Sequence, residues 1–176
     1  MKYFLFLSLP LYLLDQATKY WVLQRFPDPR VEGHEPIHVI PGFFELHRVH
    51  NTGMAFGMLN GHDYANWIFG VIGLVAISAI AIFWRKGGFP DRVSKVSAAL
   101  LISGIMGNLT DRIIPGRGYV VDFLGFQPPL YGKLFPSTGG YFPSFNVADS
   151  CICIAAGLLI IASFRQVAAE KKAAKA

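Results

Sequence analysis

The sequence predicts an all-α membrane protein, with four transmembrane helices in a single domain that covers residues 1–176. Of the 176 residues, 53% are hydrophobic and only 15% are charged, a composition too apolar for an ordinary soluble domain. Four apolar runs approach the roughly 20 residues that a helix needs to cross the hydrocarbon core of a bilayer. These runs are Tyr3–Trp21, Trp67–Trp84, Val96–Ile114 and Phe145–Phe164.

The first run, Tyr3–Trp21, is interrupted by Pro10, Asp15 and Lys19. It is not typical of a cleavable signal peptide, because charged residues follow the apolar stretch and no A-x-A site does. Asp15 and Lys19 stand four residues apart, so they share one helix face. We therefore expect an ion pair that lets both side chains enter the membrane interface and that orients the helix, tying it to Arg112 or Asn108.

The second and third runs predict helices with different tasks. No ionisable residue lies between Trp67 and Trp84, so the second helix is expected to serve packing. In the third run, Gly104 permits close approach of a neighbouring helix, and it precedes Asn108 and Arg112, which share one face. Two interpretations stay open here: a packing seam that ends in a polar cluster, or substrate positioning by Arg112.

The fourth run begins with a helix-capping pattern. Asn146 and Asp149 match an N-cap residue and a carboxylate at the third helical position, an arrangement that favours the exposed amides and the helix dipole. Cys151 and Cys153 are two residues apart on the same predicted helix. They point in different directions, so no disulfide is expected between them.

The distribution of lysine and arginine predicts the orientation in the membrane. Nine basic residues lie in three short segments: the N-terminus, the Arg85–Lys95 connection and the tail after Phe164. The two long connections, residues 25–66 and 115–144, hold five. The positive-inside rule then places both termini in the cytoplasm and both long connections outside. The net charge of +5 is thus a topology signal, and no nucleic-acid partner is expected.

The two outer connections differ in composition. The segment Val39–Phe56 carries β-branched and aromatic residues after a Pro41-Gly42 turn, a pattern that predicts a short strand or hairpin on the membrane surface. The segment 115–144 is rich in proline, glycine and aromatic residues. Its composition predicts an irregular, partly mobile loop.

Two carboxylates, Asp122 and Asp149, are the candidate catalytic residues, because both are expected at the outer edge of the membrane. A charge near hydrocarbon costs about 2.5–3.5 kcal/mol at a helix centre, so such residues usually mark function. Two adjacent carboxylates share one proton, since both cannot ionise cheaply. The ionised group can activate a water and the protonated one can donate to the substrate, with no metal or cofactor. The alternatives are capping for Asp149 and a solvated loop carboxylate for Asp122.

Two other kinds of function compete with this hypothesis. His34, Glu35 and His38 match the H-E-x-x-H pattern of zinc proteases, but the pattern needs a helix and Pro36 lies inside it. A proton-coupled transporter also uses buried carboxylates. Polar groups at only one end of the predicted helices make a poor path through the membrane, so this interpretation ranks lower.

Five ordered motifs resemble those of the bacterial lipoprotein signal peptidases (signal peptidase II). They are Asp15-Gln-Ala-Thr-Lys19, Asn51-Thr-Gly-Met-Ala-Phe56, Gly107-Asn-Leu-Thr-Asp-Arg112, Val120-Val-Asp-Phe123 and Phe145-Asn-Val-Ala-Asp149. One departure is Met54, where the family usually has a small residue. The resemblance extends from the first predicted helix to the last.

The resemblance implies a fold, an activity and a set of site residues. The fold is four transmembrane helices with a small extracytoplasmic β-cradle and an outer loop. The activity is an aspartic endopeptidase of the bacterial cytoplasmic (inner) membrane, monomeric, with Asp122 and Asp149 at its outer face. It removes the signal peptide of a diacylglyceryl-modified prolipoprotein just before the lipidated cysteine. We expect supporting roles in substrate binding or dyad geometry for Asp15, Lys19, Asn51, Gly53, Gly104, Asn108, Arg112 and Asn146.

Overall fold

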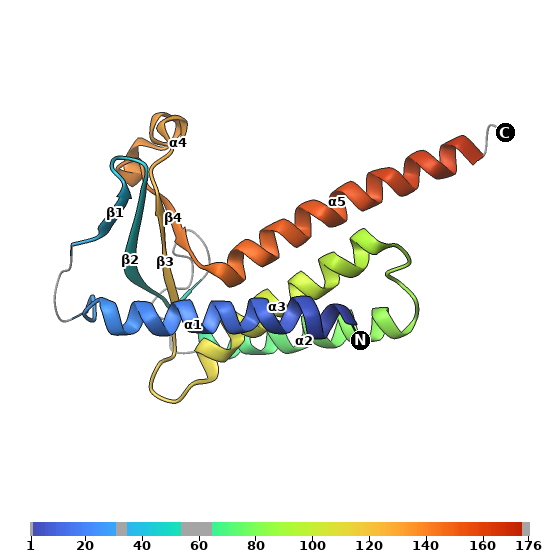
Figure 1. The fold of residues 1–176 in the computed structure, drawn as a ribbon, viewed down its shortest axis with the longest axis horizontal. Coiled ribbons are helices and arrows are strands. Elements are labelled where there is room, and N and C mark those ends of the chain that lie inside the picture. Colours follow the sequence, from blue (N-terminus) through green and yellow to red (C-terminus); the bar gives the residue numbers. More distant parts are fainter. Residues whose placement is uncertain (1, 31–34, 54–64, 174–176) are drawn as a thin grey trace.

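Long helices and a small sheet at one end make up the architecture (Figure 1). The computed structural model describes residues 2–30, 35–53 and 65–173. The sheet stands beside one end of the helices. The N-terminus, the connection between helices α2 and α3, and the far end of helix α5 all lie toward the other end (Figure 1). This arrangement agrees with an orientation in which both termini share one side of a membrane.

The helices lie close to the predicted runs. A short π-helical turn, Phe4–Ser8, continues into α1, Leu9–Arg25, and Pro10 is the second residue of α1. Helix α2 covers Ala65–Arg85 and helix α3 covers Arg92–Ile113. Helix α5 covers Val147–Ala173. It begins two residues later than predicted, because Phe145 belongs to a strand, and it continues past the predicted end at Phe164.

Within the described residues, three helical segments are long and apolar enough to cross a membrane: Trp67–Arg85, Arg92–Ile113 and Val147–Val167. The fourth expected span, Tyr3–Trp21, is also helical. Its α-helical part, α1, has 17 residues and contains Asp15 and Lys19, so its crossing of the membrane remains a prediction.

The outer segments form one antiparallel sheet of four strands in the order β1-β2-β3-β4. The predicted hairpin is present as β1, Ile37–Ile40, and β2, Phe44–Asn51; residues 54–56 of the predicted segment lie outside the described residues. The expectation of an irregular loop over 115–144 is wrong. That segment contains β3 (Val120–Phe126), a short helix α4 (Pro129–Leu134), a single 3-10 turn (Pro136–Thr138) and β4 (Phe142–Phe145).

The prediction missed β3 because this strand is mostly buried on both faces. Its residues lack the alternation of apolar and polar side chains that marks a half-exposed strand. One set of side chains, Val121 and Phe123, packs with Tyr119 against Val22 and Phe26 at the end of α1. Asp122 stands between Val121 and Phe123 in the sequence, so its side chain points to the opposite face of β3. The apolar cluster fixes the sheet on α1 and thereby sets the position of Asp122.

A polar link joins β2 to β4 across the strand between them. The ring nitrogens of His47 lie 3.0 Å from Glu45 Oε1 and 2.7 Å from Ser144 Oγ. Gly125 of β3 makes room for this crossing, because a Cβ there would stand 2.6 Å from His47 Cε1. Strand β4 leads directly into Asn146 and α5, so the link also helps to place the start of that helix.

Helices α3 and α5 pack closely along a seam of small residues. A side chain at Gly104 would collide with the carbonyl oxygen of Ala148 and with Ile152. Leu100, Cys151 and Ala155 form a buried cluster farther along the same interface. The seam predicted around Gly104 is therefore present. Cys151 and Cys153 are both free thiols, as predicted.

The Gly104→Ala variant tests this seam. The added methyl group would meet a backbone carbonyl that cannot move without shifting α5, so the free energy of unfolding should fall by about 1–3 kcal/mol, the usual cost of overpacking. The measurement is thermal unfolding in detergent. The matched control is Gly157→Ala in α5, where an added Cβ meets nothing within 4 Å and better helix propensity should raise stability slightly. Equal behaviour of the two variants would contradict the seam.

Candidate functional site

Asp122 lies in the middle of β3 and is only 2% exposed. Its register partner on β2 is Val49, next to an irregularity in the pairing of the two strands. Two amides hold the carboxylate: Asn51 Nδ2 donates to Oδ2 (2.9 Å) and Asn146 Nδ2 donates to Oδ1 (2.7 Å). Asp122 is therefore not the solvated loop carboxylate of the alternative interpretation.

Asp149 lies in the first turn of α5. Asn108 Nδ2 of α3 donates to its Oδ1 (2.7 Å), and the backbone N–H of Asn146 donates to its Oδ2 (3.2 Å). In return, the backbone N–H of Asp149 donates to Asn146 Oδ1 (2.9 Å). The predicted capping box is confirmed, and it fixes the direction of the Asp149 carboxylate.

Asn146 joins the two carboxylates. Its side chain, fully buried, donates to Asp122, and its backbone donates to Asp149. Burial, and then the neighbouring Asp149 carboxylate, raise the pKa of Asp122 from its ordinary value of 3.8 to about 7. The pair therefore holds a proton at a pH where an ordinary aspartate would have lost it.

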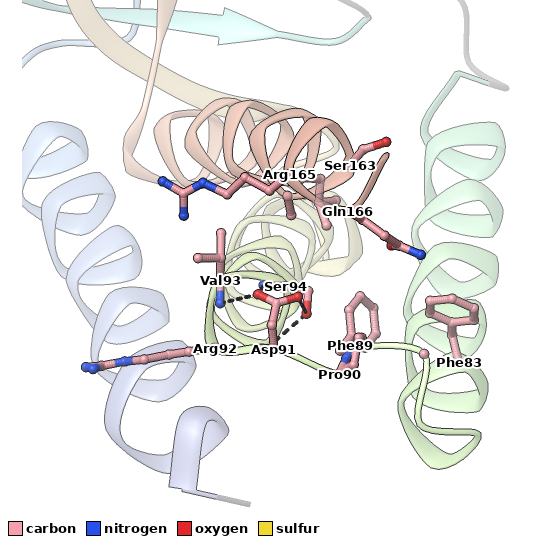
Figure 2. Close-up of a pocket in the computed structure, with 13 residues that line it drawn as sticks. Phe83, Phe89, Pro90, Asp91, Arg92, Val93, Ser94, Ser163, Arg165 and Gln166 are labelled. Atoms are coloured by element: carbon pink, nitrogen blue, oxygen red, sulfur yellow. Dashed lines mark hydrogen bonds between the residues drawn. The ribbon is translucent and has the colours of Figure 1, made fainter. Parts of the chain in front are cut away.

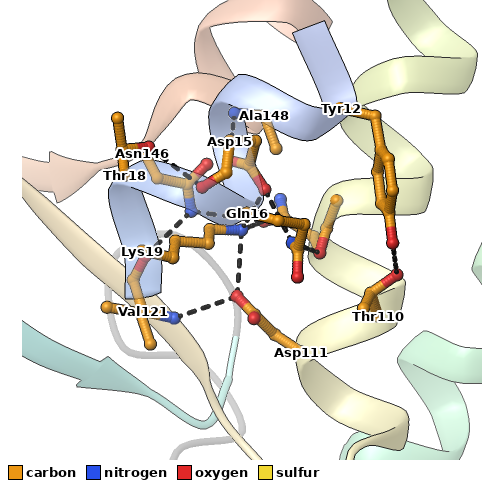
Figure 3. Close-up of polar contacts among 12 residues, drawn as sticks. Tyr12, Asp15, Gln16, Thr18, Lys19, Thr110, Asp111, Val121, Asn146 and Ala148 are labelled. Carbon is orange, nitrogen blue, oxygen red and sulfur yellow. Dashed lines mark hydrogen bonds and ion pairs between the residues drawn. The ribbon is translucent and has the colours of Figure 1, made fainter. Parts of the chain in front are cut away.

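Beside this pair, Lys19 is surrounded by oxygen atoms (Figure 3). Its Nζ lies 2.8 Å from Asp15 Oδ2 and 2.9 Å from Asp111 Oδ2, and it donates to Asn108 Oδ1 (3.0 Å). The predicted Asp15–Lys19 pair is confirmed. Of the two tertiary partners proposed for the first helix, Lys19 takes Asn108 and not Arg112. Asn108 in turn holds Asp149, so α1 reaches the candidate site through this asparagine.

The two carboxylates on Lys19 also bind other elements. Asp15 Oδ1 accepts from the backbone N–H of Ala148 in α5 (2.8 Å). Asp111 accepts from the backbone N–H of Val121, the residue before Asp122 (3.3 Å), and pairs with Arg117 (2.6 Å). Asp15, Lys19 and Asp111 have no exposed surface. Asp111 and Arg117 were not predicted as site residues, although the spacing of Asp111 from Asn108 puts the two on one helix face.

Arg112 and Gly53 lie one step farther from the carboxylates. Arg112 Nη2 donates to the carbonyl of Gly53 (3.0 Å), and its guanidinium lies 4.7 Å from the centre of the Phe69 ring. The N–H of Gly53 donates to Asn51 Oδ1 (3.0 Å), and Asn51 holds Asp122. Arg112 thus supports the Asp122 side of the pair through the backbone. Met54, which follows, lies outside the described residues.

A cavity of about 430 Å³ opens beside Asp149. Asn51 and Ser144 bring polar groups to it, while Phe142, Phe145, Ile152 and Cys153 make most of its wall apolar. The cavity therefore offers polar groups near Asp149 and a larger apolar surface from β4 and α5, as a substrate with both a peptide and a hydrocarbon part would require.

The proposed zinc motif does not have the structure that it needs. His38 lies in strand β1, Ile37–Ile40, and Glu35 precedes that strand without helical structure; His34 lies outside the described residues. His38 faces Glu45 Oε2 at 3.3 Å. Over residues 2–30, 35–53 and 65–173, no group of three or more His, Cys, Asp or Glu side chains could hold a metal ion.

Comparisons with known proteins agree on one family. The sequence profile of Signal peptidase (SPase) II matches residues 7–165. The lipoprotein signal peptidase of Symbiobacterium thermophilum is 39% identical over 149 residues, 85% of this chain and 86% of its own. That of Geobacter metallireducens is 38% identical over 160 residues, 91% of this chain and 89% of its own. A solved bacterial membrane enzyme superposes with a TM-score of 0.75 at 28% identity, over 93% of this chain and 88% of its own.

The Lys19→Ala variant tests the buried ion pairs. It leaves Asp15 and Asp111 without their shared cation, and breaking a buried pair costs about 3–5 kcal/mol. We expect a clearly lower thermal stability in detergent. Lys86→Ala, at an exposed position at the end of α2, removes the same charge as a control and should change little. Loss of activity with unchanged thermal stability would contradict the structural role of Lys19.

Proposed function

The chain belongs to the signal peptidase II family, and on this premise we propose that it is an aspartic endopeptidase of the bacterial cytoplasmic membrane. Its substrates are diacylglyceryl-modified prolipoproteins, cleaved just before the lipidated cysteine. The observation that carries the proposal is that Asn146 holds two carboxylates from different elements, the buried Asp122 and the half-buried Asp149. Neither carboxylate forms a short ion pair among the described residues, so both stay available to move protons.

The proposed reaction needs one proton shared by the pair. The ionised carboxylate takes a proton from a water molecule as the water oxygen attacks the scissile carbonyl carbon. The protonated carboxyl donates its proton to the carbonyl oxygen, giving a neutral tetrahedral diol. Collapse of this intermediate breaks the C–N bond, and the departing nitrogen takes the proton held by the first carboxylate. One hydroxyl of the diol becomes the carbonyl of the new carboxyl group and returns its proton to the second carboxylate. The pair ends with one proton, as it began, and no covalent enzyme intermediate forms.

Amide groups that donate to the two carboxylates hold each of them in one orientation. Asn51 and Asn146 donate to opposite oxygens of Asp122, while Asn108 and the backbone of Asn146 donate to Asp149. Neither carboxylate can rotate without losing a hydrogen bond. This preorganisation reduces the rearrangement needed when charge moves between the groups.

Substrate positioning follows from the location of the site. A lipid anchor keeps the modified cysteine at the membrane interface, and the positive-inside rule puts this end of the helices outside. The apolar wall of the cavity beside Asp149 suits an acyl chain or an apolar peptide segment. Binding energy from these remote groups can orient the scissile bond against the carboxylates. Arg112, whose Nη2 donates to the carbonyl of Gly53 (3.0 Å), supports the segment that carries Asn51.

The competing functions have less support. A zinc protease would need the His34, Glu35 and His38 motif on a helix, whereas the described part of it is extended. A proton-coupled transporter would need polar groups along the membrane path. In α3 the charged network lies near the C-terminal end, and the buried residues of its preceding turns are mainly small and apolar or serine.

Replacement of either carboxylate by its amide tests the proposal. Asp122→Asn and Asp149→Asn each remove a proton acceptor while keeping the size of the side chain and one of its two accepted hydrogen bonds. Each should therefore abolish cleavage of a diacylglyceryl-modified prolipoprotein by folded protein in detergent. The assay contains chelator, which separates the reaction from zinc chemistry. Asp28→Asn is the control, because Asp28 lies in the same outer region and contacts Arg30, not the pair. Cleavage that survives both substitutions, or that chelator stops, would overturn the assignment.

The raised pKa of Asp122 predicts the alkaline limit of activity. The shared proton is present below the raised value of about 7 and is lost above it, so kcat/KM should fall as the pH rises through that value. Measurement of kcat/KM for a lipidated substrate on both sides of neutral pH checks this. The Asp28→Asn variant should keep the same profile, because a hydrogen bond from Arg30 holds the pKa of Asp28 below its usual range. A rate that keeps rising at alkaline pH would contradict a shared proton.

A further inference from the structure

A second cavity lies at the end of the helices opposite to the carboxylate pair. It has a volume of about 690 Å³ and lies between the α2–α3 connection, the start of α3 and the last part of α5 (Figure 2). Arg92 stands 16 residues before Asn108, and Arg165 stands 16 residues after Asp149. At 1.5 Å per residue, each arginine is roughly 24 Å along its helix from the carboxylate pair. We call this cavity the basal crevice.

Two arginines from different helices border the basal crevice. Arg92 begins α3 and Arg165 belongs to α5, both side chains are exposed, and Figure 2 shows them on the same side of it. Neither forms an ion pair among the residues that the structure describes. The nearby acid, Asp91, is occupied as the N-cap of α3: it accepts from the backbone N–H groups of Val93 (2.7 Å) and Ser94 (3.0 Å). The border of the crevice therefore carries two arginines and one carboxylate, which leaves it with net positive charge.

The walls of the basal crevice are apolar. Phe83 and Phe89 meet edge to face with ring centres 5.1 Å apart, and Phe89 is buried. Leu159 and Ala162 of α5 line the opposite wall, with Val93 at the start of α3. A free inorganic anion would gain binding energy from the arginines alone. A molecule with both an anionic group and hydrocarbon chains would gain binding energy from the arginines and from the apolar walls.

A smaller crevice continues the positive charge toward the N-terminus. It has a volume of about 450 Å³ and is lined by Lys2, Tyr3, Phe6, Leu7 and Arg92. Arg92 therefore lies between two crevices, with Lys2 on one side and Arg165 on the other. Basic side chains above apolar walls at the predicted cytoplasmic edge are the features of a site for an anionic lipid headgroup.

We propose that the basal crevice binds an anionic glycerophospholipid of the cytoplasmic leaflet. The phosphate lies between the guanidinium groups of Arg92 and Arg165, which offer planar, bidentate donors suited to it. The acyl chains lie against Leu159, Ala162 and the Phe83–Phe89 wall. The site lies far from the carboxylate pair, so the proposal does not depend on the peptidase chemistry. Its role is to hold α5 against α3 where the two helices have no close seam.

The test measures stabilisation by added lipid. Wild-type protein in a neutral detergent is heated with phosphatidylglycerol, with phosphatidylcholine or with inorganic phosphate. We expect phosphatidylglycerol to raise Tm well above the phosphatidylcholine value and phosphate alone to have no effect. The double variant Arg92→Gln with Arg165→Gln should lose most of the difference between the two lipids. Ala162→Trp, which fills the crevice without changing the charge, should lose it as well.

A matched double variant controls for total charge. Arg85→Gln with Lys86→Gln removes two exposed basic groups at the same edge that do not line the crevice, and it should keep the full lipid-specific shift. Each protein is compared with itself without lipid, so a lower starting Tm does not affect the result. Equal losses in the two double variants would show diffuse attraction to the surface and overturn the proposal. A shift retained after Ala162→Trp, or reproduced by phosphate alone, would overturn it too.

Discussion

The structure depends on one buried cation. The Nζ of Lys19 is buried between helices, with Asp15 at 2.8 Å, Asp111 at 2.9 Å and Asn108 Oδ1 at 3.0 Å. Burial of an unpaired charge is costly, and breaking a buried pair leaves such a charge behind. Arg117, paired with Asp111, brings the cluster to two cations and two carboxylates. The helices must therefore meet in the arrangement that balances these charges, since any shift leaves one group unpaired.

This cluster also sets the geometry of the carboxylate pair, although it does not contain it. Asp111 binds the N–H of Val121, and the carbonyl of Val121 accepts from Asn146, so Asp122 follows a residue that is held from two sides. Asp149 is held through Asn108, whose oxygen faces Lys19. The catalytic proposal therefore rests on hydrogen bonds that converge from α1, α3, β3 and α5. Rigid placement by several elements is what a site needs when it must keep two like charges together.

Local patterns predicted the local features well. The Asp15–Lys19 pair and the Asn146–Asp149 capping box follow from spacings of four and three residues, and the β1–β2 hairpin follows from a turn signal between two short runs. The pairing of β3 with β2 was not predictable in this way, because it joins segments about 70 residues apart and β3 has no alternating pattern. The role of Asp111 was not predictable for the same reason, because its partners Lys19 and Val121 come from other elements. The resemblance to signal peptidase II predicted a small extracytoplasmic β-structure, but not the order of its four strands.

The hydrogen bond from Ala148 to Asp15 has a consequence for how the protein is made. The two residues are 133 positions apart, so the ribosome makes the acid long before it makes the donor. The local pair with Lys19 is available to Asp15 as soon as the first helix forms, and α3 then brings Asn108 and Asp111 to Lys19. Only α5 supplies the N–H of Ala148. A polypeptide that stops before residue 147 therefore leaves Asp15 without one of its hydrogen-bond donors.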